Sequence, residues 1–231
     1  MDSDTASRQR APLTTEGLRD ISVAFDVATP PWPGDTPFTC GWGWAIANGA
    51  SVNVSKWELS PHVGTHADAP LHVLANGAGA DRLPIAPFVG PAIVVNVAMN
   101  ARPLSLADVE RAGFKLGGAR LLLRTSCSTA TGQFPERWPT LAPEAARALT
   151  AAGLLLLGVD APSVDDRASK TLEVHRALFD GGAYVLENLD LRDVVPGAWE
   201  LLALPLRTGP LDAAPVRAFL RPLHDYSSTS P

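Results

Sequence analysis

Cysteine is scarce in this 231-residue chain, which contains only Cys40 and Cys127. They fit no CxxC spacing, and a chain of this length needs no disulfide, so a reducing, cytoplasmic environment is expected. Neither cysteine is assigned a role. Long apolar runs are also absent. The aliphatic run Leu154 to Leu157 is far too short to span a bilayer, and the polar residues 1–17 lack the apolar segment of a signal peptide.

Positive charge is not in excess either, since 19 Lys and Arg face 24 Asp and Glu, for a net charge of −5. The basic residues are scattered along the chain, which argues against a nucleic-acid or anionic membrane partner. The GxSxG elbow of serine hydrolases is missing as well. A small soluble ligand is therefore the expected partner.

Apolar residues make up 46% of the chain, enough for an ordinary core, and no low-complexity linker divides it. We expect a flexible tail over residues 1–15 and one domain over 16–231. Helical patterns cover 105–113, with Ser105 as N-cap, as well as 143–153 and 169–179. Strand-like segments are 18–25, 51–59, 92–98, 119–125, 154–160, 183–189 and 200–207.

Helices and strands alternate in the second half of the chain, and both hairpin-like and crossover connections occur. The sequence thus predicts an α/β fold with a mixed β-sheet flanked by helices. Residues 26–50 differ, because several Pro, Gly and Trp residues interrupt regular structure, and we expect a long ordered loop there.

Histidine is concentrated in one short stretch. Of five histidines, His62, His66 and His72 fall together with Asp68 in SPHVGTHADAPLH. On an extended chain these even-numbered positions share one face, whereas Gly64 and Pro70 disfavour a helix. Imidazole and carboxylate groups suit Zn²⁺, Mn²⁺ or Fe²⁺, and burying them without a metal would be costly. The stretch therefore predicts a divalent metal site.

The stretch HVGTHADAPLH resembles the HxGTHxDxPxH signature of the cyclase-like metal hydrolases, which include bacterial kynurenine formamidases and isatin hydrolases. The similarity continues through TPPWPGDTPF, GVDAPSVDDRASKTLEVHRAL, YVLEN and LPLR…LDAAPVRAFL, nearly the whole chain. SKTLxxH, followed twelve residues later by Glu187, points to the formamidase branch. The resemblance implies a cyclase-like fold of the swivelling β/β/α type.

The resemblance also implies a site of two divalent metals, expected to be zinc, with manganese, iron or cobalt as alternatives. His62, His66 and Asp68 would hold the first metal, and Asp68 would bridge to a second held by His175 and Glu187. Taken alone, His175 and Glu187 would pass for ordinary helix and strand residues. Arg176 and Asn188 depart from the residues common in formamidases.

The implied activity is hydrolysis of N-formyl-L-kynurenine to L-kynurenine and formate in the kynurenine pathway of tryptophan catabolism. Two metals would lower the pKa of water and polarise the carbonyl, and His72 would act as a non-ligand acid and base. Trp32, in a WPGD setting, is expected to contact the aryl substrate.

Two alternatives stay open. An isatin hydrolase-like enzyme would open a cyclic amide with a single metal and would not need His175 or Glu187. A non-catalytic metal-binding scaffold would keep its metal and turn over no aryl amide. The family resemblance further implies a homodimer. His224 lies outside every motif and is assigned no function.

Overall fold

A nine-stranded mixed sheet organises the chain, which we describe from a computed structural model over residues 17–100 and 102–223. The expected tail over residues 1–15 and His224 lie outside these described residues. Within them, no helix is both long and apolar enough to cross a membrane. The strand order is β1-β11-β9-β5-β6-β7-β8-β4-β10.

The centre of the sheet is parallel, as β5 pairs with β6, β6 with β7, and β7 with β8, while all other pairs are antiparallel. This confirms the predicted mixed sheet. The strands are β1 (Arg19–Asp20), β4 (His66–Asp68), β5 (Val89–Asn96), β6 (Arg120–Arg124), β7 (Leu156–Val159), β8 (Tyr184–Glu187), β9 (Gly197–Leu202), β10 (Ala213–Pro215) and β11 (Phe219–Pro222).

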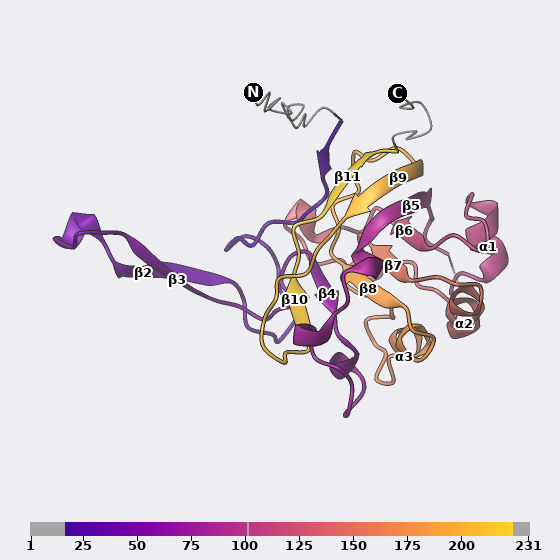
Figure 1. Cartoon of the computed structure of the whole chain (residues 1–231), viewed down its shortest axis with the longest axis horizontal. Helices are drawn as coiled ribbons and strands as arrows, with labels where there is room; N and C mark the ends of the chain where they lie inside the picture. The colour runs from indigo at the N-terminus through magenta and orange to yellow at the C-terminus, as the bar shows by residue number, and fades with distance from the viewer. Residues whose placement is uncertain (1–16, 101, 224–231) are drawn as a thin grey trace, which may run out of the picture.

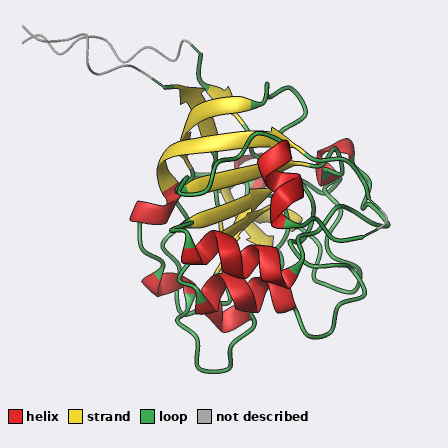
Figure 2. Ribbon diagram, turned by 90° about the vertical axis from the view of Figure 1, so that its right-hand side faces the viewer, coloured by secondary structure: helices red, strands yellow, loops and turns green. Residues whose placement is uncertain are grey.

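Three α-helices gather on one side of the curled sheet (Figures 1 and 2): α1 (Leu106–Arg111), α2 (Pro143–Ala151) and α3 (Glu173–Asp180). Alternate residues of β6 face opposite cores. Leu121 and Leu123 pack with the helices, whereas Leu122 joins a second core on the other face of the sheet. Both faces of the central strands are therefore buried, as expected for parallel strands written as apolar runs.

The three predicted helices form, and Ser105 caps α1 through a capping box with Asp108. The prediction that the third helix starts near Ser169 was wrong, because α3 begins at Glu173. The Asp165 carboxylate accepts hydrogen bonds from the backbone N–H groups of Val174 and His175, which sets the first turn of α3.

The expectation of an entirely irregular loop over residues 26–50 was also wrong. Its second half contains β2 (Thr39–Trp44) and a 3₁₀ turn (Ile46–Asn48), and β2 pairs with β3 (Val54–Glu58) in a separate hairpin. Figure 1 shows this hairpin projecting far from the body of the molecule. The short strands β10 and β11 were not predicted, since AAP and FLRP carry little strand signal of their own.

Candidate metal centre and pocket

Strand β4 carries the centre of the candidate site. It lies between β8 and β10, and its register places His66 opposite Glu187. Side chains alternate along a strand, so His66 and Asp68 share one face, as the sequence predicted. His175 reaches the same place from α3, and its Nε2 lies 3.1 Å from Asp68 Oδ2.

His62 and His72 arrive by other routes than an extended chain. His62 lies in the turn before β4, where Gly64 adopts φ 66°, and a Cβ there would lie 2.7 Å from the Phe25 ring. Only glycine fits both the conformation and the space. His72 ends a 3₁₀ turn, Pro70–His72. The shared face expected of an extended chain thus holds for His66 and Asp68 alone, whereas the turns on either side of β4 bring in His62 and His72.

Three donor atoms form a nearly equilateral triangle. His62 Nδ1 is 3.2 Å from Asp68 Oδ1 and 3.2 Å from His66 Nε2, and His66 Nε2 is 3.3 Å from Asp68 Oδ1. Tetrahedral zinc with ligand bonds of about 2.0–2.1 Å places its donors about 3.3–3.4 Å apart. Among the described residues, Asp68 Oδ1 is the one buried side-chain nitrogen or oxygen without a hydrogen-bond partner. The triangle thus has the size that a bound cation needs, and one of its three ligand atoms, the oxygen Asp68 Oδ1, has no other partner.

A second set of donors surrounds the other oxygen of Asp68. His175 Nε2 lies 3.1 Å from Asp68 Oδ2 and 3.2 Å from Glu187 Oε1. All three side chains are buried, with exposed fractions of 5% or less. A carboxylate that offers one oxygen to each of two donor sets can bridge two metals. The geometry therefore accommodates two ions that share Asp68.

Each of these three histidines has a second ring nitrogen that points away from the candidate metal positions. A protein oxygen lies within hydrogen-bond distance of each of these outer nitrogens. His62 Nε2 lies 2.9 Å from Asp212 Oδ2, His66 Nδ1 lies 3.0 Å from the Gly64 carbonyl, and His175 Nδ1 lies 2.7 Å from Asp165 Oδ2. Because these oxygens accept, a neutral ring would carry its proton on the outer nitrogen and leave the inner nitrogen free to bind a metal. Metal-binding histidines are held in this way.

The carboxylates make the cluster strongly cation-attracting. Burial lowers the pKa of His62, but the hydrogen bond with Asp212 and the neighbouring Asp68 carboxylate outweigh it and raise this pKa to about 9. Burial also opposes protonation of His66, yet the charge of Asp68 raises its pKa to about 10. The same fields that favour a proton on these rings favour a divalent cation among them.

His72 stands slightly apart from the triangle. Its donor atom lies within 4.8 Å of those of His62 and Asp68, its side chain is 27% exposed, and its Nδ1 is 3.6 Å from Asp212 Oδ2. The distances of 3.1 to 3.3 Å within the cluster all join the other candidate ligand atoms, not those of His72. His72 is therefore placed beside the centre, where it can reach a bound molecule and solvent.

Sequence reasoning missed Asp165 and Asp212. Asp165 sits ten residues before His175, and Asp212 lies 150 residues after His62, so no short spacing links either aspartate to its histidine. Their segments, GVDAPSVDDRAS and LDAAP, were noticed only for their resemblance to the family. Strand β10 begins just after Asp212 and pairs with β4, which brings this carboxylate to the histidines.

In formamidases a glycine is common at the position after Glu187, where this chain has Asn188. The backbone conformation at this position explains why either residue can stand there. Its φ is 55°, a left-handed value that glycine and asparagine tolerate best. The Asn188 side chain also donates to the His62 carbonyl at 3.3 Å and accepts from Thr129 at 2.9 Å. Asparagine thus secures the turn that carries His62.

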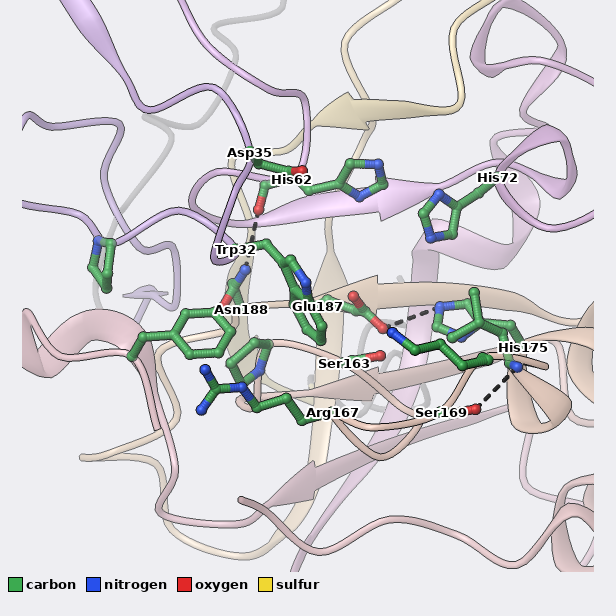
Figure 3. A pocket seen from close by; sticks show the side chains of 15 residues that line it. Trp32, Asp35, His62, His72, Ser163, Arg167, Ser169, His175, Glu187 and Asn188 are labelled. Atoms are coloured by element: carbon green, nitrogen blue, oxygen red, sulfur yellow. Dashed lines mark hydrogen bonds and ion pairs between the residues drawn. The ribbon is translucent and has the colours of Figure 1, made fainter. Parts of the chain in front are cut away.

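A cavity of about 310 Å³ opens beside the donor cluster (Figure 3). Trp32 lines it and packs edge-on against Phe134 and Trp138, with ring centroids 5.4 and 6.0 Å away. Of the other aromatic residues of the N-terminal loop, Trp42 and Trp44 lie on the projecting hairpin and are exposed. The cavity is also lined by Asp35, His62, His72, Ser163, Arg167, Ser169, Lys170, Leu172, His175, Glu187 and Asn188.

Comparison with known proteins agrees with this geometry. Residues 19–166 match the family described as "Putative cyclase". The kynurenine formamidase of Bordetella petrii is 42% identical over 207 residues, covering 89% of this chain and 98% of that protein. A solved structure named a predicted metal-dependent hydrolase, from Bacillus stearothermophilus, has a TM-score of 0.73 at 26% identity, covering 88% and 97%. Isatin hydrolase A from Labrenzia aggregata shares the fold, with a TM-score of 0.76 at 22% identity, covering 91% and 96%.

Proposed function

The chain belongs to the cyclase family of metal-dependent hydrolases, and from that premise we propose that it hydrolyses N-formyl-L-kynurenine to L-kynurenine and formate. Support for this substrate comes from the 42% identical kynurenine formamidase, which aligns along nearly all of its own length. The observation that carries the chemistry is Asp68 Oδ1, a buried carboxylate oxygen with no hydrogen-bond partner between two imidazole nitrogens.

In this proposal the donors hold two divalent metals. His62, His66 and Asp68 Oδ1 hold the first, and Asp68 Oδ2, His175 and Glu187 hold the second. The metals are zinc, since three nitrogen and oxygen donors with one open position are typical of catalytic zinc sites. The same ligand types also suit manganese, iron and cobalt. When bound, the metals supply a nucleophile from water near neutral pH and polarise the formyl oxygen.

His72 supplies the proton chemistry of the reaction. Cleavage of an N-aryl formamide releases an aniline, which leaves readily only once its nitrogen has been protonated. The His72 ring borders the cavity and contacts His62, with ring centroids 4.5 Å apart. It can take a proton from the attacking water and return it to the leaving nitrogen, the role of a general acid and base. Asp212, 3.6 Å from Nδ1, orients the ring.

The aromatic wall of the cavity orients the substrate ring. Trp32 is held by two edge-on aromatic contacts, and aryl ligands pack well against such rings. A cavity of about 310 Å³ is near the lower end of the usual range for small ligands, roughly 300–1,000 Å³. A single benzoyl ring with a short amino-acid chain is of the right size.

A homodimer is the assembly we propose. The hairpin of β2 and β3 extends away from the body (Figure 1) and exposes large apolar side chains, including Trp42, Trp44 and Trp57. An apolar arm of this kind is stable in water when it packs against another surface. A second copy offers the same arm in return. A cytoplasmic location fits the two free cysteines, Cys40 and Cys127.

The direct test combines metal content with turnover on two substrates, N-formyl-L-kynurenine and isatin. Two metals per chain, with rapid turnover of N-formyl-L-kynurenine, are expected. One metal and preferential turnover of isatin would favour a cyclic-amide hydrolase instead. Bound metal without turnover of either compound would favour a non-catalytic scaffold.

A further inference from the structure

Apart from the candidate metal ligands, the wall of the cavity carries two positively charged side chains on one side. Arg167 and Lys170 both line it, and both come from the loop between β7 and α3. Among the described residues, neither side chain forms an ion pair with an acidic group. Asp35 also lines the cavity, but Figure 3 shows it on the His62 side, and it accepts a hydrogen bond from Ser60 at 3.1 Å. Two unneutralised cations therefore face the cavity from one loop.

This loop is held in place by hydrogen bonds on either side of Arg167 and Lys170. Asp165 accepts hydrogen bonds from the backbone N–H groups of Val174 and His175, at 3.0 Å each, and from the His175 ring. Within the loop, Asp166 accepts from the Ala168 N–H at 2.8 Å, and Ser169 Oγ accepts from the Leu172 N–H. The backbone that carries Arg167 and Lys170 is thus tied to the residues of the metal centre.

The Arg167 side chain is also directed by an aromatic contact. Its guanidinium lies over the Phe134 ring, 5.5 Å from the centroid, and Phe134 in turn packs edge-on against Trp32. Figure 3 shows Arg167 across the cavity from His72. An aryl ring held at Trp32 would then lie between the proton-transferring histidine and the guanidinium.

We propose that Arg167, assisted by Lys170, binds the carboxylate of the substrate and so selects aryl formamides that carry an amino-acid chain. The inference rests on the proposed formamidase function and names its specificity residues. In N-formyl-L-kynurenine the carboxylate stands at the end of a short chain, ortho to the formamide on the ring. Its negative charge needs a counter-charge in a cavity that already holds Glu187. A guanidinium can grip a carboxylate through two parallel hydrogen bonds, which a lone ammonium cannot do.

The test compares two substrates that differ only at this end: N-formyl-L-kynurenine and N-formyl-2-aminoacetophenone, which lacks the amino acid. For Arg167→Gln, kcat/KM on the first should fall about 10- to 100-fold, the loss of one charge-assisted contact, mainly through KM. On the second substrate it should change less than twofold. Arg167→Lys should recover part of the loss, and Lys170→Gln should show a smaller loss.

Arg147→Gln is the charge-matched control, because Arg147 lies on the solvent side of α2 and does not line the cavity. It should leave both substrates unchanged. Equal losses on the two substrates in Arg167→Gln would indicate a structural role and overturn the proposal, as would no loss on either. A wild type inactive on both compounds would refute the formamidase function alone. The subsite is then judged by calorimetric binding of L-kynurenine, which must weaken at least tenfold in Arg167→Gln to sustain it.

Discussion

Replacement of Glu187 by glutamine tests the second metal directly. The change keeps the size of the side chain and an oxygen that can accept the Val164 N–H, a bond of 2.8 Å. It removes the negative charge, because the oxygen 3.2 Å from His175 Nε2 is the same Oε1 and becomes a neutral amide oxygen, a much weaker metal ligand. The fold should therefore survive while the second donor set loses one of its two carboxylates.

The size of the effect follows from the donor geometry. Loss of a residue that merely supports a metal ligand costs about 10- to 100-fold in metal affinity. Glu187 is itself a donor in the proposed second set, so its loss should exceed that range, by at least 100-fold or about 2.7 kcal/mol. The first set, formed by His62, His66 and Asp68 Oδ1, keeps all its atoms. We expect Glu187→Gln to retain one metal of two and to lose about 10³-fold in kcat, equivalent to about 4 kcal/mol of barrier.

The assay is elemental analysis after gel filtration in metal-buffered solution, with kcat measured on N-formyl-L-kynurenine and thermal unfolding to verify the fold. Glu173→Gln is the matched control, because Glu173 is an exposed glutamate in the first turn of α3. It should bind two metals and react at the wild-type rate. If Glu187→Gln also bound two metals and kept its rate, the reasoning from the donor distances would be refuted and the isatin hydrolase-like alternative would gain support.

Three further outcomes are expected. His72→Ala should keep both metals and lose about 10²- to 10⁴-fold in rate, whereas loss of a metal would make His72 a ligand. Trp42→Ser with Trp44→Ser should convert a dimer to a monomer by light scattering; an unchanged mass would remove the hairpin from the interface. Hydrogen bonds from Arg102 and the α1 cap lower the pKa of Asp108 from its ordinary 3.8, so its ionised form stabilises the fold above that pH. Asp108→Asn should therefore reduce Tm at pH 7, with a deficit that shrinks as the pH falls below about 3.8; an equal deficit at both pH values would contradict this.

The sequence predicted the residues of the site better than it predicted their local structure. HVGTHADAPLH placed His62, His66, His72 and Asp68 together, and they do converge. Alternation along a strand accounts only for His66 and Asp68, because β4 is three residues long. A left-handed glycine and a 3₁₀ turn bring in the other two. Nearness in sequence sufficed, since a short chain segment cannot carry its side chains far apart.

The secondary structure was likewise predicted where the local residues specify it, and it was missed where contacts with other parts of the chain specify it. Parallel strands such as β6 were predicted because a strand buried on both faces must be written as a continuous apolar run. The start of α3 was misplaced because the Asp165 carboxylate, nine and ten residues before the N–H groups that it accepts from, sets the first turn. The strand β10 was missed because its pairing with β4, not its own residues, makes it a strand.

By itself, the sequence placed His62, His66, Asp68 and His72 in one candidate site, its family resemblance added His175 and Glu187, and its periodicity predicted the α/β class with a mixed sheet. Only the tertiary structure decided how the donors divide around the two oxygens of Asp68, and that Asp165 and Asp212 hold the histidine rings. Only the fold placed Arg167 beside Phe134 on the wall of the cavity. The physical reason is that propensity and periodicity act over a few residues, whereas these contacts join residues ten or more positions apart that meet only in the folded chain.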